Sequence, residues 1–401
     1  MPSADALRAT QLIRTIVDSC PDRLAGSASE LRAQEILKAE MDAAGTQTEL
    51  RPFRYNTHLY ATLALHFGLA VLATALVWVS AALAFALHLL VAVSYTLDSS
   101  RRARILRRLM PFVDSQNLVA TLPARAALRL RLVFVAHADA AYTGIVFNPN
   151  VVHHATKQPP IAALGFMRKG LRVATVSVLL LAVLDLLVVL GVGVPAWIFW
   201  PLTIPAFLAF ALNFEVVLRN TLVPGANDNL TGCAANVILA ERLADRPDDV
   251  ELVFVASGAE EAGCGGAWGL ALDKAADWST DNTVILGIDG LSNGKIRWFE
   301  DGEVLPMPPA QKLIAAVESA AAADPRFAEV ERYEIPTGAT DCSPFLAMGY
   351  HAVCIGCVDP WIGAPKHYHL PTDTPDNLDV EQYDLSIDFV EAAARSIIAA
   401  Y

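Results

Sequence analysis

The sequence predicts an α/β domain into which four transmembrane helices are inserted as two hairpins. Apolar, strand-like stretches alternate with helical stretches through most of the 401 residues. Continuous apolar strands are typical of a sheet that helices cover on both faces. Between Arg54 and Asp98 there is no Asp, Glu, Lys or Arg, and between Arg172 and Glu215 there is only Asp185.

Each of these two apolar segments is long enough to cross a membrane twice. One helix needs about 20 apolar residues to span the hydrocarbon core, and each segment is about twice that length. "GVGVPAW" at 191–197 is the expected turn of the second hairpin, and the first should turn near Trp78 to Ser80. Buried helical hairpins of a soluble protein are the alternative, but soluble core helices rarely stay uncharged this long. Asp185 is a candidate functional residue, and pairing with His66 or His88 is the simpler role that we expect.

Outside the hairpins, the predicted elements follow one another in the order of an α/β domain. Helices are expected at 1–19, 29–45, 228–245, 308–322 and 384–401, and strands, some running into loops, within 46–55, 116–123, 129–139, 249–263, 282–294 and 351–359. Ser27 or Ser29 is a possible N-cap of the second helix, and Gly45 is its expected stop.

The composition narrows the class of function. The formal net charge of -12 argues against a nucleic-acid partner, because no basic face is available to replace counterions. A hydrophobic fraction of 54% is high for a purely soluble enzyme. The six cysteines are scattered and do not suggest a disulfide framework, so Cys354 and Cys357 are expected as buried thiols. The N-terminus lacks the features of a signal peptide.

Polar residues that suit metal binding stand at the predicted ends of the strands, where α/β sheets carry their sites. The set is His137, Asp139, Asp228, Glu260, Glu261, Asp289, His367 and His369. Each residue alone has an ordinary structural role, such as a helix cap, a turn or a solvated loop charge. Together, histidine and carboxylate ligands suit zinc or a related divalent ion. Five ligands with one shared carboxylate suit a two-metal hydrolytic site.

In this order the motifs resemble the M28 family of zinc aminopeptidases over nearly all of the chain outside the hairpins. The motifs are "DRLAGSASELRAQEILKAEMDAAG", "NLVATLP", "VFVAHAD", "GANDNLTGCA", "SGAEEAGCGG", "GIDG", "TDCSPFLAMGYHAVCIG" and "HLPTDTPDNLD". The resemblance implies a mixed, mostly parallel central sheet of the zinc aminopeptidase type. It also implies two Zn²⁺ ions, or related divalent ions, as cofactors.

The resemblance assigns a role to each site residue. His137, Asp228 and Asp289 would hold one ion, and Asp228, Glu261 and His369 the other, with Asp228 bridging. Glu260 would be the general base, and Asp139 would orient His137. His369 is preferred to His367 because the late histidine of the family stands four residues before an Asp-Thr pair, here Asp373 and Thr374. The family often has a cis peptide after the bridging aspartate, here Asp228–Asn229.

The implied reaction is cleavage of a peptide or aminoacyl-amide bond by metal-activated water, with Glu260 carrying the proton to the leaving amine. The sequence differs from the M28 pattern in two features that concern the substrate. The second hairpin interrupts the connection between His137 and Asp228, and Asp341-Cys342 stands where relatives often have Asp-His. The alternatives are a glutaminyl-cyclase-like acyltransferase with a single zinc and a catalytically inactive, receptor-like relative. No residues that would bind a free α-amine can be identified.

The expected organisation is a discontinuous zinc hydrolase domain at 1–57, 98–165 and 220–401, with transmembrane hairpins at 58–97 and 166–219. Arginine and lysine flank the hairpins at Arg51, Arg54, Arg101, Arg102, Arg104, Arg107, Arg108, Arg168, Lys169, Arg172 and Arg219. Because basic residues favour the inner side, the sequence predicts a multi-pass membrane protein with a cytoplasmic catalytic domain. The lipid bilayer is thus an expected partner, and hydrophobic or lipid-linked substrates would meet the site near it.

Overall fold

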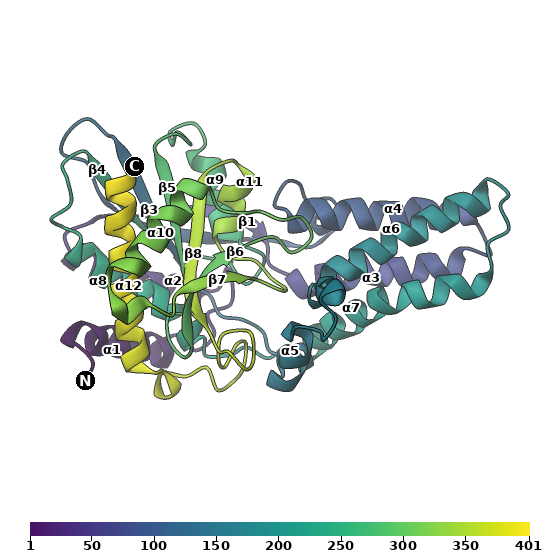
Figure 1. Cartoon of the computed structure of the whole chain (residues 1–401), viewed down its shortest axis with the longest axis horizontal. Helices are drawn as coiled ribbons and strands as arrows, with labels where there is room; N and C mark the ends of the chain where they lie inside the picture. The colour runs from purple at the N-terminus through teal and green to yellow at the C-terminus, as the bar shows by residue number, and fades with distance from the viewer.

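The structure is a computed structural model, and it describes residues 1–161 and 164–401. An α/β domain forms one end of the molecule, and a bundle of four long helices projects from it (Figure 1). Both chain termini lie at the end of the molecule away from the bundle. The predicted fold class, an α/β domain with four apolar helices, is confirmed.

Within the described residues, the α/β domain is built on one sheet of eight strands. The strands are β1 Gln47–Asn56, β2 Phe112–Leu122, β3 Leu130–His137, β4 Val250–Ser257, β5 Thr283–Asp289, β6 Lys295–Glu300, β7 Glu331–Glu334 and β8 His351–Val358. Their order across the sheet is β1-β2-β4-β3-β5-β8-β6-β7. The central strands β4, β3, β5 and β8 run parallel, whereas the pairs β1–β2, β2–β4 and β6–β8 are antiparallel. The sheet is therefore mixed and parallel at its centre, as predicted.

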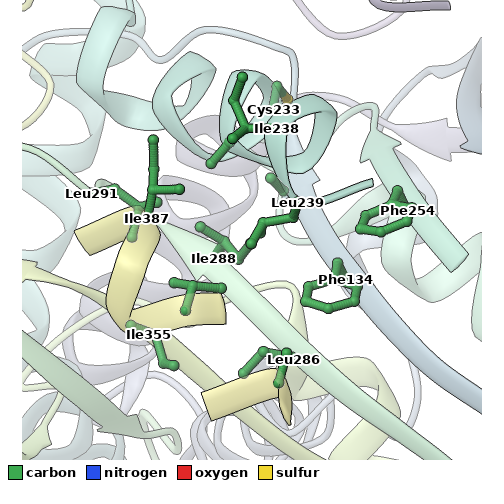
Figure 2. Packing of buried hydrophobic residues seen from close by; sticks show 14 of the residues in the cluster. Phe134, Cys233, Ile238, Leu239, Phe254, Leu286, Ile288, Leu291, Ile355 and Ile387 are labelled. Atoms are coloured by element: carbon green, nitrogen blue, oxygen red, sulfur yellow. The ribbon is translucent and has the colours of Figure 1, made fainter. Parts of the chain in front are cut away.

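Helices cover both faces of the sheet. One face carries α1 Ala4–Ser19, α2 Ala28–Ala43, α8 Thr231–Arg242, α10 Gln311–Ala323 and α12 Val380–Ala400, and the other carries α9 Gly265–Lys274 and α11 Cys342–Ala347. Leu132 and Phe134 of β3 belong to the first core, whereas Val133 and Val135 belong to the second, because alternate strand positions face opposite sides. In Figure 2, Phe134 and Phe254 lie together in the first core, where their rings stack with centroids 4.8 Å apart.

The expected helix at 228–245 begins only at Thr231. Asp228 and Asn229 have non-helical dihedral angles, and the peptide bond between them is cis. Sequence periodicity does not predict β6, β7, α9, α11 or the short helix α5 Pro149–Thr156. These elements are short, so few residues carry their pattern. Ser27 is the N-cap of α2 and accepts a hydrogen bond from the backbone N–H of Glu30.

The bundle consists of α3 Leu59–Leu76, α4 Ala81–Ser99, α6 Gly170–Val189 and α7 Phe199–Arg219. By length and composition, these four helices could cross a membrane. α3 packs against α4 and α7, and α6 packs against the same two helices. Large apolar side chains such as Leu179, Phe207 and Leu218 are exposed on the outside of the bundle. At the far end, Trp78 and Trp200 stack with ring centroids 5.9 Å apart.

The inside of the bundle contains a histidine–aspartate pair. His88 Nδ1 lies 2.6 Å from Asp185 Oδ2, and both side chains are fully buried. His88 Nε2 faces the carbonyl of Ala70 at 2.9 Å and Thr74 Oγ1 at 3.2 Å. Asp185 therefore pairs with the other hairpin, as expected, and the partner is His88; His66 instead faces Ser94.

The basic cluster after α4 attaches the first hairpin to the α/β domain. Arg107 is buried, forms an ion pair with Asp98 at 2.8 Å and donates to the carbonyl of Ala262. Arg104 lies over the rings of Tyr55 and Trp268. These contacts fix the hairpin to the α/β domain, so the arginines have a structural role besides any effect on membrane orientation.

Candidate active site

The carboxyl ends of β3, β4 and β5 lie side by side at one edge of the sheet. β3 lies between β4 and β5 and is parallel to both. His137 is the last residue of β3, Asp289 is the last residue of β5, and Glu260 lies in the loop after β4. His137 Nε2 is 3.9 Å from both Glu260 Oε2 and Asp289 Oδ1. Three separate motifs therefore meet at this edge.

Asp228 stands between two histidines. Its Oδ1 lies 3.1 Å from His137 Nε2, and its Oδ2 lies 3.4 Å from His369 Nε2. Glu261 Oε2 approaches the same nitrogen of His369 at 3.3 Å. The structure thus brings together His137, Asp228, Glu261, Asp289 and His369, with Glu260 beside them.

Of the two late histidines, His369 is the one in this cluster. His367 Nδ1 pairs with Thr372 Oγ1 at 2.8 Å in an exposed position. His369 is buried. The preference for His369 therefore has a geometric basis.

Asp139 joins the end of β3 to the loop after β4. Its two carboxylate oxygens accept hydrogen bonds from the backbone N–H groups of Glu260 and Glu261, each at 3.0 Å. Asp139 Oδ1 is 3.6 Å from His137 Nδ1, whereas the backbone carbonyl of Asp139 is 3.3 Å from that nitrogen. The carboxylate therefore holds the two glutamates at least as directly as it orients His137.

Two buried side chains hold the loop that carries Asp228. The carboxylate of Asp373 accepts hydrogen bonds from the backbone N–H groups of Asn227 at 2.8 Å and Asp228 at 3.1 Å. Arg23 donates to the carbonyls of Ala138 and Pro224 at 2.9 and 2.6 Å, so it ties this loop to the end of β3. Arg23 was not predicted, because an arginine in a loop is usually solvated and its sequence gives no sign of burial.

The electrostatics of the cluster favour a bound cation. Burial raises the pKa of Glu260 and Glu261 well above the ordinary value. Burial and then the charge of Asp228 raise the pKa of Asp289 to about 8. Burial alone would raise the pKa of Asp228, but hydrogen bonds with His137 and His369 bring it below its usual range. Buried carboxylates that lie close together repel one another when they are charged. A metal ion between them stabilises the charged form.

The donor set fits such an ion. His137, Asp228 and Glu261 each place one ligand atom within 4.8 Å of the others. Glu261 Oε1 is buried and has no hydrogen-bond partner among residues 1–161 and 164–401. A buried carboxylate oxygen without a partner is costly, and metal coordination would satisfy it.

A second group of side chains surrounds Glu260. Cys264 donates a hydrogen bond from its thiol to Glu260 Oε1 at 3.2 Å, and Asp341 lies close to both. Arg101, which follows α4, donates to Cys264 Sγ at 3.4 Å. The first hairpin therefore reaches the surroundings of Glu260 through one arginine. Cys342, which stands where relatives often have histidine, is buried in the core behind the site.

One family model matches the part of the chain that carries most of this cluster. The model of peptidase family M28 matches residues 213–394, a segment that contains Asp228, Glu260, Glu261, Asp289 and His369. Residues 213–394 are therefore similar to peptidase family M28, the family that the motifs resemble. No curated protein matches the chain significantly.

Solved structures with a similar fold align with nearly the whole chain. BSAP, a zinc aminopeptidase from Bacillus subtilis, has a TM-score of 0.58 and 14% identity, with 98% of this chain and 94% of that chain covered. Glutaminyl cyclase from Fimbriiglobus ruber has a TM-score of 0.56 and 15% identity, with 98% and 95% covered. The aminopeptidase from Aneurinibacillus sp. strain AM-1 has a TM-score of 0.55 and 14% identity, with 97% and 93% covered. Because the sequence identities are only 14–15%, these similarities show a shared fold.

Proposed function

We propose that this protein is a membrane-embedded dizinc aminopeptidase, or a related amidohydrolase, that cleaves a peptide or amide bond with water. The observation that carries the proposal is the position of Asp228, whose two oxygens face two different histidines. A carboxylate that presents one oxygen to each of two half-sites suits a bridge between two ions. Asp289 would complete the half-site of His137, and Glu261 that of His369.

The distances around His369 suit zinc. Ligand atoms that lie about 2.0–2.2 Å from a tetrahedral ion are about 3.3–3.6 Å from one another. His369 Nε2 lies 3.4 Å from Asp228 Oδ2 and 3.3 Å from Glu261 Oε2, within this range. The distances from His137 Nε2, 3.1 Å to Asp228 Oδ1 and 3.9 Å to Asp289 Oδ1, lie on either side of it. When bound, zinc would acidify water and polarise the carbonyl of the scissile bond.

Glu260 is the residue that would move the proton. Its Oε2 lies 3.9 Å from His137 Nε2, but the residue is outside the three-ligand group of His137, Asp228 and Glu261. Its carboxylate would take a proton from the water as the new C–O bond forms, and would give that proton to the leaving nitrogen as the amide C–N bond then breaks.

A glutaminyl-cyclase-like reaction with one zinc is the second candidate. Glutaminyl cyclases match the chain over the same length as aminopeptidases and with similar TM-scores. In a cyclase the α-amine of the substrate attacks its own side-chain amide and ammonia leaves, so no water is consumed. Asp289 discriminates between the two functions, because only the dinuclear site needs it as a ligand.

We also propose that the chain is divided as the sequence predicts, with a discontinuous hydrolase domain and hairpins at 58–97 and 166–219. The four apolar helices, their exposed apolar side chains and the tryptophans at the far end support membrane insertion. The far-end turns carry no lysine or arginine, which supports a cytoplasmic catalytic domain. The site would then lie close to the bilayer, within reach of hydrophobic or lipid-linked peptides and amides.

Metal analysis of the purified full-length protein, in detergent, tests the site. Wild-type protein is expected to hold about two divalent ions per chain, and Asp289→Ala about one. One ion in both proteins, together with ammonia release from a glutaminyl peptide, would favour the cyclase. No tightly bound ion in the wild type would refute both functions.

A further inference from the structure

A residue of the first membrane helix touches the candidate metal ligand His369. Tyr60 lies in the first turn of α3, and its hydroxyl oxygen is 3.3 Å from His369 Nδ1. The other ring nitrogen of His369 faces Asp228 and Glu261. One histidine therefore connects the carboxylates of the site with the membrane bundle.

Aromatic rings hold Tyr60 and His369 in this arrangement. The ring of Phe147 lies 4.3 Å from that of His369, and the ring of Tyr368 lies 4.0 Å from it, both measured between centroids. Tyr60 packs edge-on against Phe147 at 6.1 Å and Tyr142 at 6.3 Å. Tyr142 and Phe147 lie in the segment between β3 and the second hairpin, so the surroundings of His369 combine the first hairpin with a loop of the α/β domain.

The two histidines of the site are oriented in different ways. His137 Nδ1 faces the backbone carbonyl and carboxylate of Asp139, which lies at the end of the same strand. In His369, the ring nitrogen Nδ1 faces the hydroxyl group of Tyr60 instead. A histidine that binds a metal through Nε2 is neutral and carries its proton on Nδ1, and a partner for that N–H fixes the ring and the tautomer.

We propose that Tyr60 is a positioning residue for His369, so that the first membrane helix completes the metal site of the enzyme domain. The N–H at Nδ1 of His369 donates to the hydroxyl oxygen of Tyr60, which turns Nε2 toward Asp228 and Glu261. The proposal rests on the proposed function in one respect, because it requires His369 to bind a metal ion.

Tyr60→Phe in the full-length protein, purified in detergent, tests the role, since it removes the hydroxyl and keeps the ring. Affinity for Zn²⁺ is measured by competition with a chelator, and the visible absorption of Co²⁺ in the same site reports ligand geometry. Loss of such a hydrogen-bond partner typically weakens metal binding by about 10–100-fold, and at least a tenfold loss is expected here. The Co²⁺ spectrum should change, while the unfolding midpoint of the metal-free protein should not. Tyr142→Phe is the matched control and should bind Zn²⁺ like the wild type.

The outcomes separate this proposal from the proposed function. His369→Ala should lose the same ion more severely than Tyr60→Phe. If His369→Ala loses the ion while Tyr60→Phe keeps wild-type affinity and an unchanged Co²⁺ spectrum, the role of Tyr60 is refuted and the metal site stands. Equal losses in Tyr60→Phe and Tyr142→Phe would indicate general packing and would also refute the role. If His369→Ala binds Zn²⁺ like the wild type, the proposed site itself is wrong.

Discussion

The carboxylate of Asp139 accepts a hydrogen bond, 3.0 Å long, from the backbone N–H of Glu260. Its second oxygen accepts one of the same length from Glu261. One buried side chain thus sets the distance between His137, at the end of β3, and the two glutamates that follow β4. A carboxylate suits this position because both of its oxygens are acceptors, whereas an amide offers only one.

Asp139→Asn should therefore lower both the stability of the protein and its metal affinity, although the two side chains have nearly the same size. One of the two backbone N–H groups would lose its acceptor, which costs about 1–3 kcal/mol of stability for a buried donor. Metal affinity should fall by about 10–100-fold, as for other partners of metal ligands. Thermal unfolding and chelator competition measure both effects. Asp376→Asn, at an exposed ion pair with Arg14, is the control. Unchanged metal affinity in Asp139→Asn would contradict this role.

Glu260→Gln should abolish turnover and keep the metal. Glutamine preserves the shape of the side chain but cannot accept a proton, and loss of a general base costs about 100-fold or more in kcat. The measurement is kcat on an aminoacyl amide together with metal content. Glu318→Gln, at an exposed position of α10, is the matched control and should keep wild-type turnover. A metal-replete Glu260→Gln enzyme with near-normal kcat would exclude the proton-transfer role.

Asp185→Leu should destabilise the bundle. His88 Nδ1 would lose its partner at a fully buried position, and an unsatisfied buried donor costs about 1–3 kcal/mol. Asp185→Asn retains an acceptor oxygen for His88 and should cost less. Thermal unfolding in detergent compares the two variants. If leucine and asparagine lower the midpoint equally, the hydrogen bond to His88 does not stabilise the bundle.

The turn of the second hairpin should face the outside of the cell. A cysteine at Gly193 is expected to react with a membrane-impermeant thiol reagent applied to intact cells, while a cysteine at Glu318 should react only after lysis. The six native cysteines are buried free thiols, so they give little background. The reverse pattern of labelling would place the catalytic domain outside.

Substrates with longer apolar tails should be cleaved with higher kcat/KM. Each buried methylene contributes about 0.8 kcal/mol, so a few carbons in contact with apolar surface produce a large preference. A series of aminoacyl amides of increasing chain length, assayed below the micelle concentration, measures it. A flat profile would mean that the hairpins anchor the enzyme without selecting its substrate.

The sequence predicts the layers of this fold and the order of its motifs well, because both depend on local patterns. Continuous apolar strands mark β3, β4, β5 and β8, and long uncharged segments mark the bundle. Of the residues expected as metal ligands, His137 and Asp289 end neighbouring parallel strands, so topology brings them to one edge. Asp228 and His369 lie outside the strands, so their positions depend on how their segments fold back to that edge. Their assignment as ligands stays a prediction.

The contacts between the bundle and the site could not be predicted. Tyr60 and Arg101 lie in or beside an apolar segment, and their types suit a membrane interface, so nothing in the sequence indicates contacts with His369 or Cys264. Likewise, Arg23 and Asp373 act through the backbone of distant loops. Such contacts depend on how segments far apart in the sequence pack against one another. Local sequence periodicity carries no information about that packing.

The pairing of β1 with β2 also constrains how the protein is made. Asn56 pairs with Phe112 in an antiparallel ladder, although the whole first hairpin is synthesised between them. If α3 and α4 cross the bilayer as proposed, β1 leaves the ribosome before its neighbour exists and can pair with β2 only after both helices have been inserted. A first helix that failed to return would leave β1 and β2 on opposite sides of the membrane, unable to pair. Under that proposal, correct insertion of the first hairpin is a condition for completing this edge of the sheet.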